Sequence, residues 1–456
     1  MNDEAMPACP LISILISAVW AVAVAAAADQ PPNVVLFYID NVGYGDIGCY
    51  GNPVIRTPNI DRLAREGVRC TDFYVVTSSC TPSRGALLTG RYPLRNGLTH
   101  QLSRDENWSG VGLPHSETIL PQFLKPAGYA TGCFGKWNVG FAKGSRPTDR
   151  GFDEFFGCRS GNIDYHTHVY NGQEDLYRGT EPVDVDGYST DLFADAACEF
   201  IQRHRERPFF AYVPFNAAHV PNPKNKVAGE PVVWQAPAKY FERYGYAADS
   251  TDPHEGYHAV MTALDDAIGR TVDLIDQLGL RNNTIVVVAS DNGASIRENL
   301  VLETGTNSPF RGGRTETYEG GIRTACIVRW PERIQPGTVC REPIANIDLL
   351  PFVLSAAGQS VPGGLQLDGR NPTATLVGEA PSPHKFLFFE FRKWSAVRSG
   401  RWKIVRSRPD AAFQLYDLAS DWGETRDLID EHPEIAHRLI GAFEKWRGQF
   451  SREPRR

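Results

Sequence analysis

The sequence predicts an α/β protein: a large, mostly parallel or mixed sheet sandwiched by helices, followed by a small C-terminal α+β unit. Three observations lead to this fold class. Continuous apolar runs typical of buried strands occupy 33–40, 208–217 and 284–290. Segments with helical periodicity separate them, at 189–206 and 254–279, and such alternation is typical of parallel sheets. Near the C-terminal end the pattern changes to short, aromatic-rich strands.

Composition is that of an ordinary globular protein. The 456 residues are 42% hydrophobic and 22% charged, which is enough chain for a large core and two domains. Lys and Arg number 47 against 54 Asp and Glu, a net charge of −7, and basic residues cluster only at the C-terminal end, so no nucleic-acid partner is expected. The nine cysteines form no C-x-x-C pair, which argues against a structural zinc site or a small disulfide scaffold.

The N-terminal segment predicts export. Residues 11–28 form an apolar run ending in small residues, as in a secretory signal peptide cleaved near Ala28, although acidic residues stand where positive charge is usual. A membrane anchor is the rival interpretation, but the run is short for a span and no second one follows. We therefore expect a signal peptide over 1–28, a large domain over 29–375, a small domain over 376–456, periplasmic or secreted localisation and no stable membrane insertion.

The first half of the chain opens with the strand 33–40, which ends in Asp40. Thr57 and Pro58 are typical of a helix start, with threonine as the cap and proline in the first turn, and they predict a helix through Arg65. A further helix is expected from Ser116, its predicted cap, to the glycine near residue 128, followed by a strand that turns into a loop over 129–140.

The second half continues the alternation. The strand 208–217 is followed by an irregular segment over 220–253, rich in Pro, Asn, Lys and Tyr, of the kind that contacts substrates. The strand 284–290 delivers Asp291 and the two residues after it. The chain ends with four short strands, at 385–392, 395–398, 401–406 and 413–418, and a helix at 433–450. This pattern predicts a four-stranded antiparallel sheet with a helix.

The stretch that begins at Cys80 has the layout of a site for an anionic ester. Cys80 lies where an N-cap would lie, and Pro82 falls in the first turn. First-turn amides and the helix dipole would point at Cys80 and favour an anion there. The guanidinium group of Arg84, one helical turn later, can reach back and bind the same anion with two N–H donors.

This stretch, CTPSRGALLTGR, resembles the signature of the type I sulfatases, C-x-P-S-R followed by L-T-G-R. The resemblance implies an alkaline-phosphatase-like fold and a Cys80 oxidised to formylglycine by a formylglycine-generating enzyme, with the hydrate as nucleophile. It extends across most of the chain, through the blocks PNVVLFYID, TPNIDRLAREGV, GYATGCFGKW, RGFDEFFG, ANIDLLPFVLSAAG and QLYDLASDWGETRDL.

Oxygen ligands follow two of the predicted strands. Asp40 ends one strand, and Asp291 and Asn292 follow another, a set that suits Ca²⁺ or Mg²⁺. The resemblance implies calcium, bridging to the sulfate and to residue 80, which places Cys80 in the metal site. The family's second aspartate is replaced by Asn41 here. The amide oxygen of Asn41 can still bind the metal, but the replacement removes one negative charge from the site.

Lys136, in the family's G-K-W motif, is expected to bind a sulfate oxygen or the formylglycine hydroxyl. The histidine that follows this motif in the family is replaced by Asn138. An amide donates or accepts hydrogen bonds but takes up no proton near neutral pH, so Asn138 is expected to contact substrate without acting as the base that regenerates the aldehyde.

His219 ends a strand and matches the family's H-x-P histidine, which binds sulfate and protonates the leaving oxygen. Arg314 lies where many sulfatases have lysine; its charge suits a sulfate oxygen, but arginine does not release its proton at working pH. His219 is therefore the expected proton donor, and Asp291 is expected to help deprotonate the nucleophile.

The motif GNIDYHTH supplies candidates for the rim of a substrate site. Asp164 and His168 are expected to contact substrate, and an extended backbone would place His166 and His168 on one face. A base in place of Asn138 would come from one of these two histidines.

Together these residues predict a sulfatase, arylsulfatase-like, that cleaves a sulfate ester, with a carbohydrate as the expected substrate. Two alternatives stay open. One is a phosphate or phosphonate ester hydrolase on the same fold, since the two anions have similar shapes. The other is a catalytically impaired glycan-binding relative, for which Asn41 and Asn138 would be signs of decay.

Overall fold

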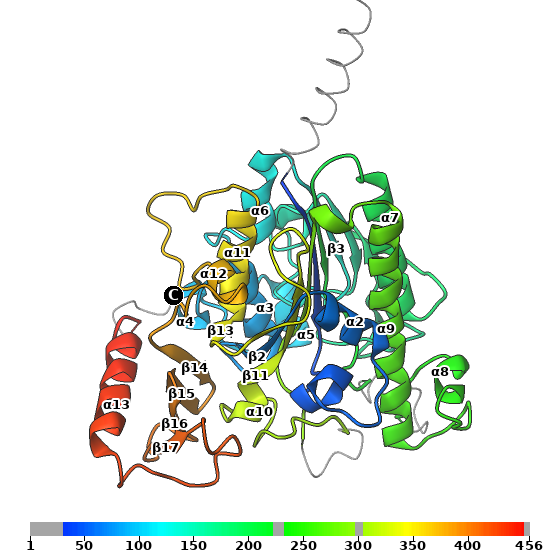
Figure 1. Cartoon of the computed structure of the whole chain (residues 1–456). Helices are drawn as coiled ribbons and strands as arrows, with labels where there is room; N and C mark the ends of the chain where they lie inside the picture. The colour runs from blue at the N-terminus through cyan, green and yellow to red at the C-terminus, as the bar shows by residue number, and fades with distance from the viewer. Residues whose placement is uncertain (1–30, 222–231, 297–303, 451–456) are drawn as a thin grey trace, which may run out of the picture.

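The computed structural model describes residues 31–221, 232–296 and 304–450 (Figure 1). The predicted signal peptide lies outside these residues. Within the described ranges, no helix combines the length and apolar character needed to cross a bilayer.

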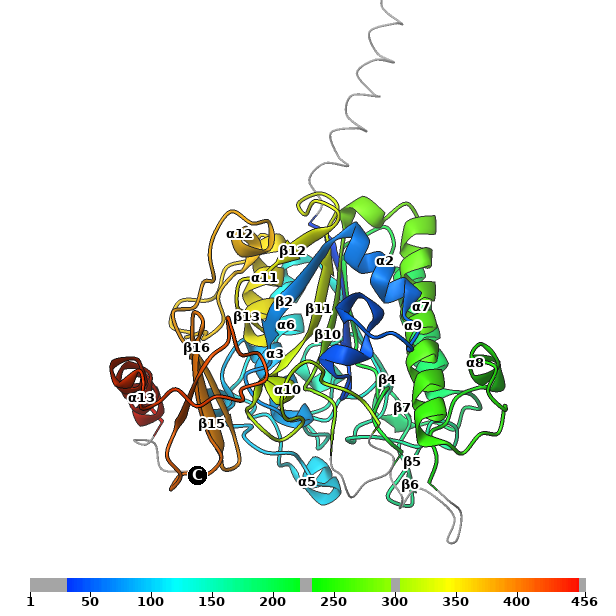
Figure 2. The same ribbon diagram turned by 60° about the horizontal axis from the view of Figure 1, so that its bottom comes forward.

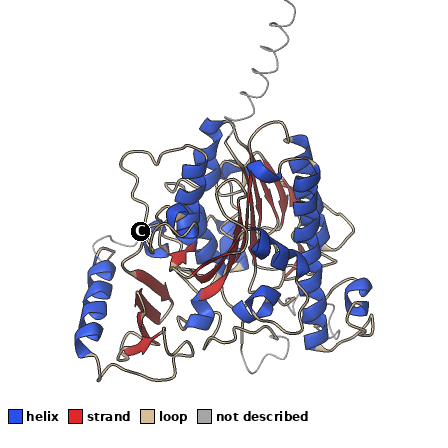
Figure 3. Ribbon diagram, in the orientation of Figure 1, coloured by secondary structure: helices blue, strands red, loops and turns tan. Residues whose placement is uncertain are grey.

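A large mixed sheet of 11 strands forms the centre of the molecule (Figure 3) and confirms the predicted fold class. Its middle is parallel, in the order β10-β1-β9-β3-β4, and β11 and β2 extend it in antiparallel fashion on one side. The strands are β1 (Asn33–Ile39), β2 (Val68–Tyr74), β3 (Ala130–Phe134), β4 (Glu154–Gly157), β7 (Tyr177–Arg178), β8 (Glu181–Pro182), β9 (Phe209–Val213), β10 (Thr284–Ser290), β11 (Arg323–Arg329), β12 (Thr338–Cys340) and β13 (Ile344–Ala345). A separate hairpin pairs β5 (Val169–Tyr170) with β6 (Gln173–Glu174).

Helices cover both faces of this sheet (Figures 1 and 2). Because side chains alternate along a strand, Leu36 and Tyr38 of β1 enter one apolar core, while Val35 and Phe37 enter the other. One face carries α3 (Cys80–Thr89), α6 (Leu120–Leu124) and α11 (Leu349–Ala356), and the other carries α2 (Pro58–Glu66), α7 (Ser189–Arg203) and α9 (Pro253–Gln277). Short helices complete the layers: α4 (Pro93–Asn96), α5 (Arg104–Ser109), α8 (Ala238–Glu242), α10 (Glu319–Ile322) and α12 (Thr373–Leu376).

A second sheet near the C-terminal end is four-stranded and antiparallel, as predicted. Its strands are β14 (Leu387–Phe391), β15 (Trp394–Ser399), β16 (Trp402–Arg406) and β17 (Gln414–Asp417), and α13 (Pro433–Gly448) packs on it. We call residues 387–448, which comprise β14–β17, α13 and the loops between them, the C-terminal unit.

Some predicted boundaries and caps were wrong. The helix expected from Ser116 begins at Leu120, after the N-cap Ile119. Thr57 occupies the N-cap of α2, but its hydroxyl accepts from the amide of Gly48 and donates to Asp61, so it makes no capping bond. The hydroxyl of Thr57 thus pairs with Gly48 and Asp61 instead of with a first-turn amide of α2.

Two further differences concern the sheet and the irregular segment. Strands β2 and β11 were not predicted, because β2 carries charged residues and β11 follows directly on a glycine-rich stretch. The segment 220–253, predicted without regular structure, contains the short helix α8 among its described residues.

Candidate active site

The site lies where parallel strands β1 and β10 end side by side. Their register pairs Ile39 with Ser290, so Asp40 and Asp291, each the next residue, emerge at the same edge of the sheet. The amide of Asn41 donates to Oδ1 of Asp291 at 3.1 Å. Asn41 has φ of 57°, a left-handed conformation that asparagine tolerates better than most residues. The backbone thus turns both carboxylates towards one point.

Cys80 lies at that point, fully buried at the start of α3. It is the first helical residue and Ser79 is the N-cap, one position earlier than predicted. Its Sγ is 3.3 Å from Oδ1 of Asp40 and 3.5 Å from Nη2 of Arg314. Burial, with Asp291 and Asp40 nearby, raises the pKa of the thiol to about 11, so the unmodified side chain is a thiol near neutral pH.

Each carboxylate has a buried cationic partner. Nη2 of Arg84 lies 2.7 Å from Oδ2 of Asp291, and Nζ of Lys136 lies 2.5 Å from Oδ2 of Asp40. Arg84 also donates to the carbonyl of Lys136 at 3.2 Å, which joins the two pairs. With Arg314 as a third cation against two carboxylates, the site carries net positive charge and suits an anion.

The metal donors predicted from sequence lie together. One ligand atom from each of Asp40, Cys80 and Asp291 falls within 4.8 Å of the others. Oδ1 of Asn292 is buried and has no hydrogen-bond partner among the described residues, while Nδ2 of Asn292 donates to Oδ1 of Asn41 at 2.7 Å. An orphaned acceptor beside two carboxylates and an amide oxygen fits a hard divalent cation.

Asn138 is buried with neither end of its amide satisfied. Its Oδ1 and Nδ2 have no partner within the described ranges, and its backbone has φ of 51°. The backbone N–H of Asn138 donates to the carbonyl of Arg159 at 3.1 Å, and this bond fixes the loop after β3. Since buried amides are normally paired, an unpaired side-chain amide two residues after Lys136 is suited to a bound ligand.

His219 is held in one tautomer. Its Nδ1 lies 2.7 Å from the carbonyl of Val220, so Nδ1 carries the proton and Nε2 is left as the acceptor. Burial, together with the positive charges of Lys136 and Arg314, holds the pKa of His219 well below its usual range. The ring is therefore neutral until an anion or a proton source changes its surroundings.

The rim residues differ in part from the prediction. Residues 164–168 form a turn, so His166 is exposed and His168 is buried, and the expectation that both face one side was wrong. Oδ1 of Asp164 accepts from the amides of His166 and Thr167, and a His168 ring nitrogen lies 3.2 Å from the carbonyl of Gly187. Asp164 shapes this loop, because such Asx turns fold the backbone around the carboxylate.

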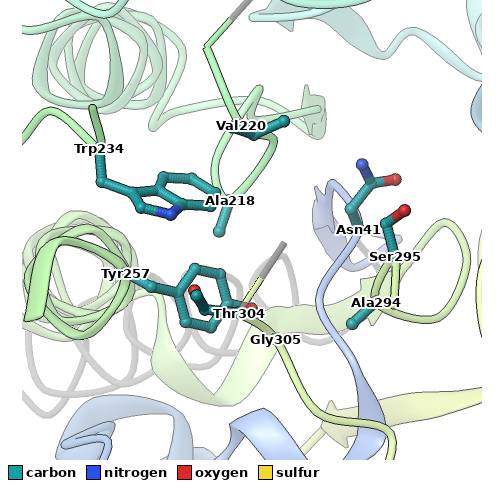
Figure 4. A pocket seen from close by; sticks show the side chains of 9 residues that line it. All are labelled: Asn41, Ala218, Val220, Trp234, Tyr257, Ala294, Ser295, Thr304 and Gly305. Atoms are coloured by element: carbon teal, nitrogen blue, oxygen red, sulfur yellow. The ribbon is translucent and has the colours of Figure 1, made fainter. Parts of the chain in front are cut away.

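A small cleft opens beside Asn41 and was not predicted (Figure 4). The aromatic side chains of Trp234 and Tyr257 lie on one side, across from Asn41 and Ser295. The rings of Trp234 and Tyr257 meet edge to face at 5.1 Å. The hydroxyl of Ser295 has no hydrogen-bond partner among the described residues. Trp234 and Ser295 lie in loops and Tyr257 lies in α9, and none of them belongs to a motif, so sequence reasoning had no signal for them.

Gln101 is another residue that sequence reasoning missed. Its Oε1 accepts from the Ser79 hydroxyl and from the amide of Thr81, both at 3.1 Å, and it thereby caps the start of α3. The amide side chain comes from a loop and anchors the turn that carries Cys80.

Two family models match this chain. The family model described as Sulfatase matches residues 32–359, and the model described as N-sulphoglucosamine sulphohydrolase, C-terminal, matches residues 314–448.

Individual proteins are also similar to this chain. The chain is 34% identical over 429 residues to N-acetylgalactosamine-6-sulfatase of Rattus norvegicus, covering 90% of this chain and 76% of that protein. It is 32% identical over 485 residues to arylsulfatase A of Bos taurus, covering 93% and 89%. The crystal structure of Ps i-CgsB in complex with k-i-k-neocarrahexaose superposes with a TM-score of 0.81 and 28% identity, covering 91% of this chain and 93% of that one.

Proposed function

The chain belongs to the sulfatase family and is a sulfuric ester hydrolase, and we propose that it removes sulfate from a carbohydrate with a formylglycine made from Cys80 and a bound Ca²⁺. The observation that carries this proposal is the convergence on Cys80 of two carboxylates and the Arg314 cation.

The cations bind and orient the sulfuryl group. Arg84, Lys136 and Arg314 approach from different elements and place positive charge on several sides of the oxygens that gain negative charge. Preorganised donors of this kind contribute about 3–4 kcal/mol each to transition-state stabilisation.

The metal would be held by Asp40, Asn41, Asp291 and Asn292, together with residue 80. When bound, it supplies further positive charge to the sulfuryl oxygens and to the nucleophile. Mg²⁺ is the alternative ion, because the donors are all hard oxygens apart from residue 80.

As formylglycine, residue 80 would supply a hydrate oxygen that attacks sulfur. Asp291 lies within reach of that position and helps to take up the nucleophile's proton. Burial and the nearby Asp40 raise the pKa of Asp291, which makes its carboxylate a better proton acceptor than an exposed aspartate.

The leaving alcohol needs a proton, and His219 is positioned to give it. The negative charge of a bound ester offsets Lys136 and Arg314, so binding favours protonation of Nε2 of His219. Arg314 stays charged throughout and contributes binding rather than proton transfer.

The cleft beside Asn41 opens next to the charged residues, where the sugar that carries the ester would contact the protein. Trp234 and Tyr257, both nearly fully buried, form the apolar wall of this cleft, and the unpaired hydroxyl of Ser295 is available to a sugar hydroxyl. Asn138, which is not among the residues that line the cleft, also has unpaired polar atoms. Asp164 and His168 lie in the neighbouring loop, where Gln235 donates to Asp164 at 2.9 Å. The relative named N-acetylgalactosamine-6-sulfatase and the structure in complex with k-i-k-neocarrahexaose support a carbohydrate substrate.

The apolar run 11–28 supports export to the periplasm or beyond, with 29–375 as the catalytic domain and 376–456 as the small domain. A formylglycine-generating enzyme is then required during maturation.

The deciding experiment is the mass of the peptide that contains Cys80, from protein co-produced with a formylglycine-generating enzyme. Conversion of the thiol to the aldehyde, and loss of activity in Cys80→Ala, are expected. A thiol that persists while a control sulfatase is converted would overturn the proposal.

Matched sulfate and phosphate esters of one alcohol separate the remaining alternatives. We expect a higher kcat/KM for the sulfate ester. Preference for the phosphate ester would favour a phosphate or phosphonate ester hydrolase, and tight glycan binding without hydrolysis would favour an impaired binding protein.

A further inference from the structure

Arg314 reaches Cys80 from residues 311–319, which we call the Arg314 segment; its backbone is irregular up to residue 318, and its last residue begins α10. The amide of Arg314 donates to the carbonyl of Ala294 at 3.0 Å. The next amide, of Thr315, donates to the carbonyl of Ser78 at 2.8 Å. These two bonds set the segment against the end of β10 and the start of α3.

The segment is strained next to Arg314. Thr315 has φ of 77°, in the left-handed region that β-branched residues rarely adopt. Such a conformation persists only where the surrounding structure holds it, and it is found mainly at functional sites. Something outside the segment must therefore hold it in place.

The C-terminal unit supplies that support. Nη1 of Arg311 donates to the carbonyl of Glu424 at 2.7 Å, and the hydroxyl of Tyr318 donates to Oε1 of Gln414 at 3.1 Å. The amide of Glu319, at the other end of the segment, donates to Oε2 of Glu424 at 2.6 Å. Figure 2 shows α10, which begins at Glu319, beside the C-terminal sheet.

A buried lysine of the C-terminal unit contacts the end of the Arg314 segment. Nζ of Lys403 lies 2.8 Å from Oε1 of Glu319 and 2.9 Å from Oε1 of Glu424, and all three side chains are fully buried. Along β16 the side chains alternate: Arg406 lies over Phe443 of α13, while Lys403 faces the other way. Lys403 thus faces the catalytic region from the C-terminal sheet.

We propose that Lys403 and Glu424 are positioning residues, which act across the contact between the two sheets to hold Arg314 in its place at residue 80. In this proposal both residues act through the Arg314 segment and not by contact with the substrate. The inference rests on the proposed role of Arg314 in binding a sulfuryl group. It assigns to the C-terminal unit a part in substrate binding by the large domain.

Glu424→Gln and Glu424→Ala test this assignment with an aryl sulfate as substrate and inorganic sulfate as ligand. Glu424→Gln keeps an acceptor for the Glu319 amide and loses the charge facing Lys403. We expect Glu424→Ala to raise KM and the Kd for sulfate about tenfold, with a smaller rise for Glu424→Gln. In an Arg314→Ala background, Glu424→Ala should change neither constant further, because its effect passes through Arg314.

Leu439→Ala is the matched control, because Leu439 is buried in α13 on the opposite side of the C-terminal sheet. It should lower Tm and leave KM and the sulfate Kd unchanged. If Glu424→Ala and Glu424→Gln behave like this control, or if the losses multiply in the double variant, the inference is overturned. Sulfate binding measured by calorimetry needs no turnover, so an inactive wild type would refute the proposed function while the coupling is still measured.

Discussion

Lys136 and Asp40 form a fully buried ion pair, with Nζ 2.5 Å from Oδ2, directly beside the thiol of Cys80. The pair stabilises a carboxylate that also faces the proposed metal site. Loss of the lysine alone would leave a buried negative charge, whereas loss of both charges would not.

Lys136→Met is therefore expected to destabilise the protein by about 3–5 kcal/mol in chelator and to lower kcat/KM about 100- to 1000-fold in calcium. Adding Asp40→Asn should restore most of the stability and none of the activity. Urea unfolding and steady-state kinetics measure the two effects. Recovery of activity in the double variant would show that Lys136 has only a structural role.

Asn41→Asp is expected to tighten Ca²⁺ binding about tenfold, because it adds a carboxylate at a position that now offers an amide oxygen. Aspartate tolerates the left-handed φ of 57° nearly as well as asparagine, so the backbone is not strained. Calorimetry on chelator-treated protein, and the rise of Tm with calcium, measure the change. Asn41→Ala is the control and should weaken binding; equal affinity of all three proteins would remove residue 41 from the metal site.

Asn138→His is expected to speed turnover about tenfold or more if proton removal limits the release of sulfate, since an imidazole can act as a base where the amide does not. Histidine is also among the residues that tolerate positive φ. Rapid mixing with an aryl sulfate should show a burst of alcohol before a slower steady state in the wild type, and a smaller burst in the variant. A wild type without a burst would mean that another group already serves as the base.

The pH dependence of kcat/KM should report His219. Its pKa lies well below 6.5 in the free protein, so the fraction that can donate a proton falls as pH rises through that lowered pKa. We therefore expect kcat/KM to increase towards acid pH, within the range where the fold persists. In His219→Gln this increase should be absent. A rate that rises from acid to neutral pH through His219 would instead make this histidine a base.

Trp234→Ala should distinguish sugar from aryl substrates. Its ring forms one side of the cleft, so its loss should raise KM for a sulfated oligosaccharide about tenfold, with a small effect on a simple aryl sulfate. Ser295→Ala removes a hydroxyl from the opposite side and gives a comparison. Equal changes for both substrate types would mean that Trp234 shapes the sulfuryl site rather than a sugar subsite.

The sequence alone predicted the α/β class, the C-terminal sheet and most of the strands that deliver the site, because continuous apolar runs and short motifs are local signals. Asp40, Cys80, Arg84 and Asp291 were identified from motifs and lie together. Charged β2 was missed, since its residues are buried by neighbouring strands rather than by their own pattern.

Only the tertiary structure decided which residues far apart in the chain pair with each other. The tautomer of His219, the unsatisfied amide of Asn138 and the cleft at Trp234 depend on which groups surround each side chain. The contact of Lys403 with Glu319 joins residues 84 positions apart. Motifs specify which chemical groups are present, but burial and distance set their charge and their partners, and these arise only when the strands and helices pack.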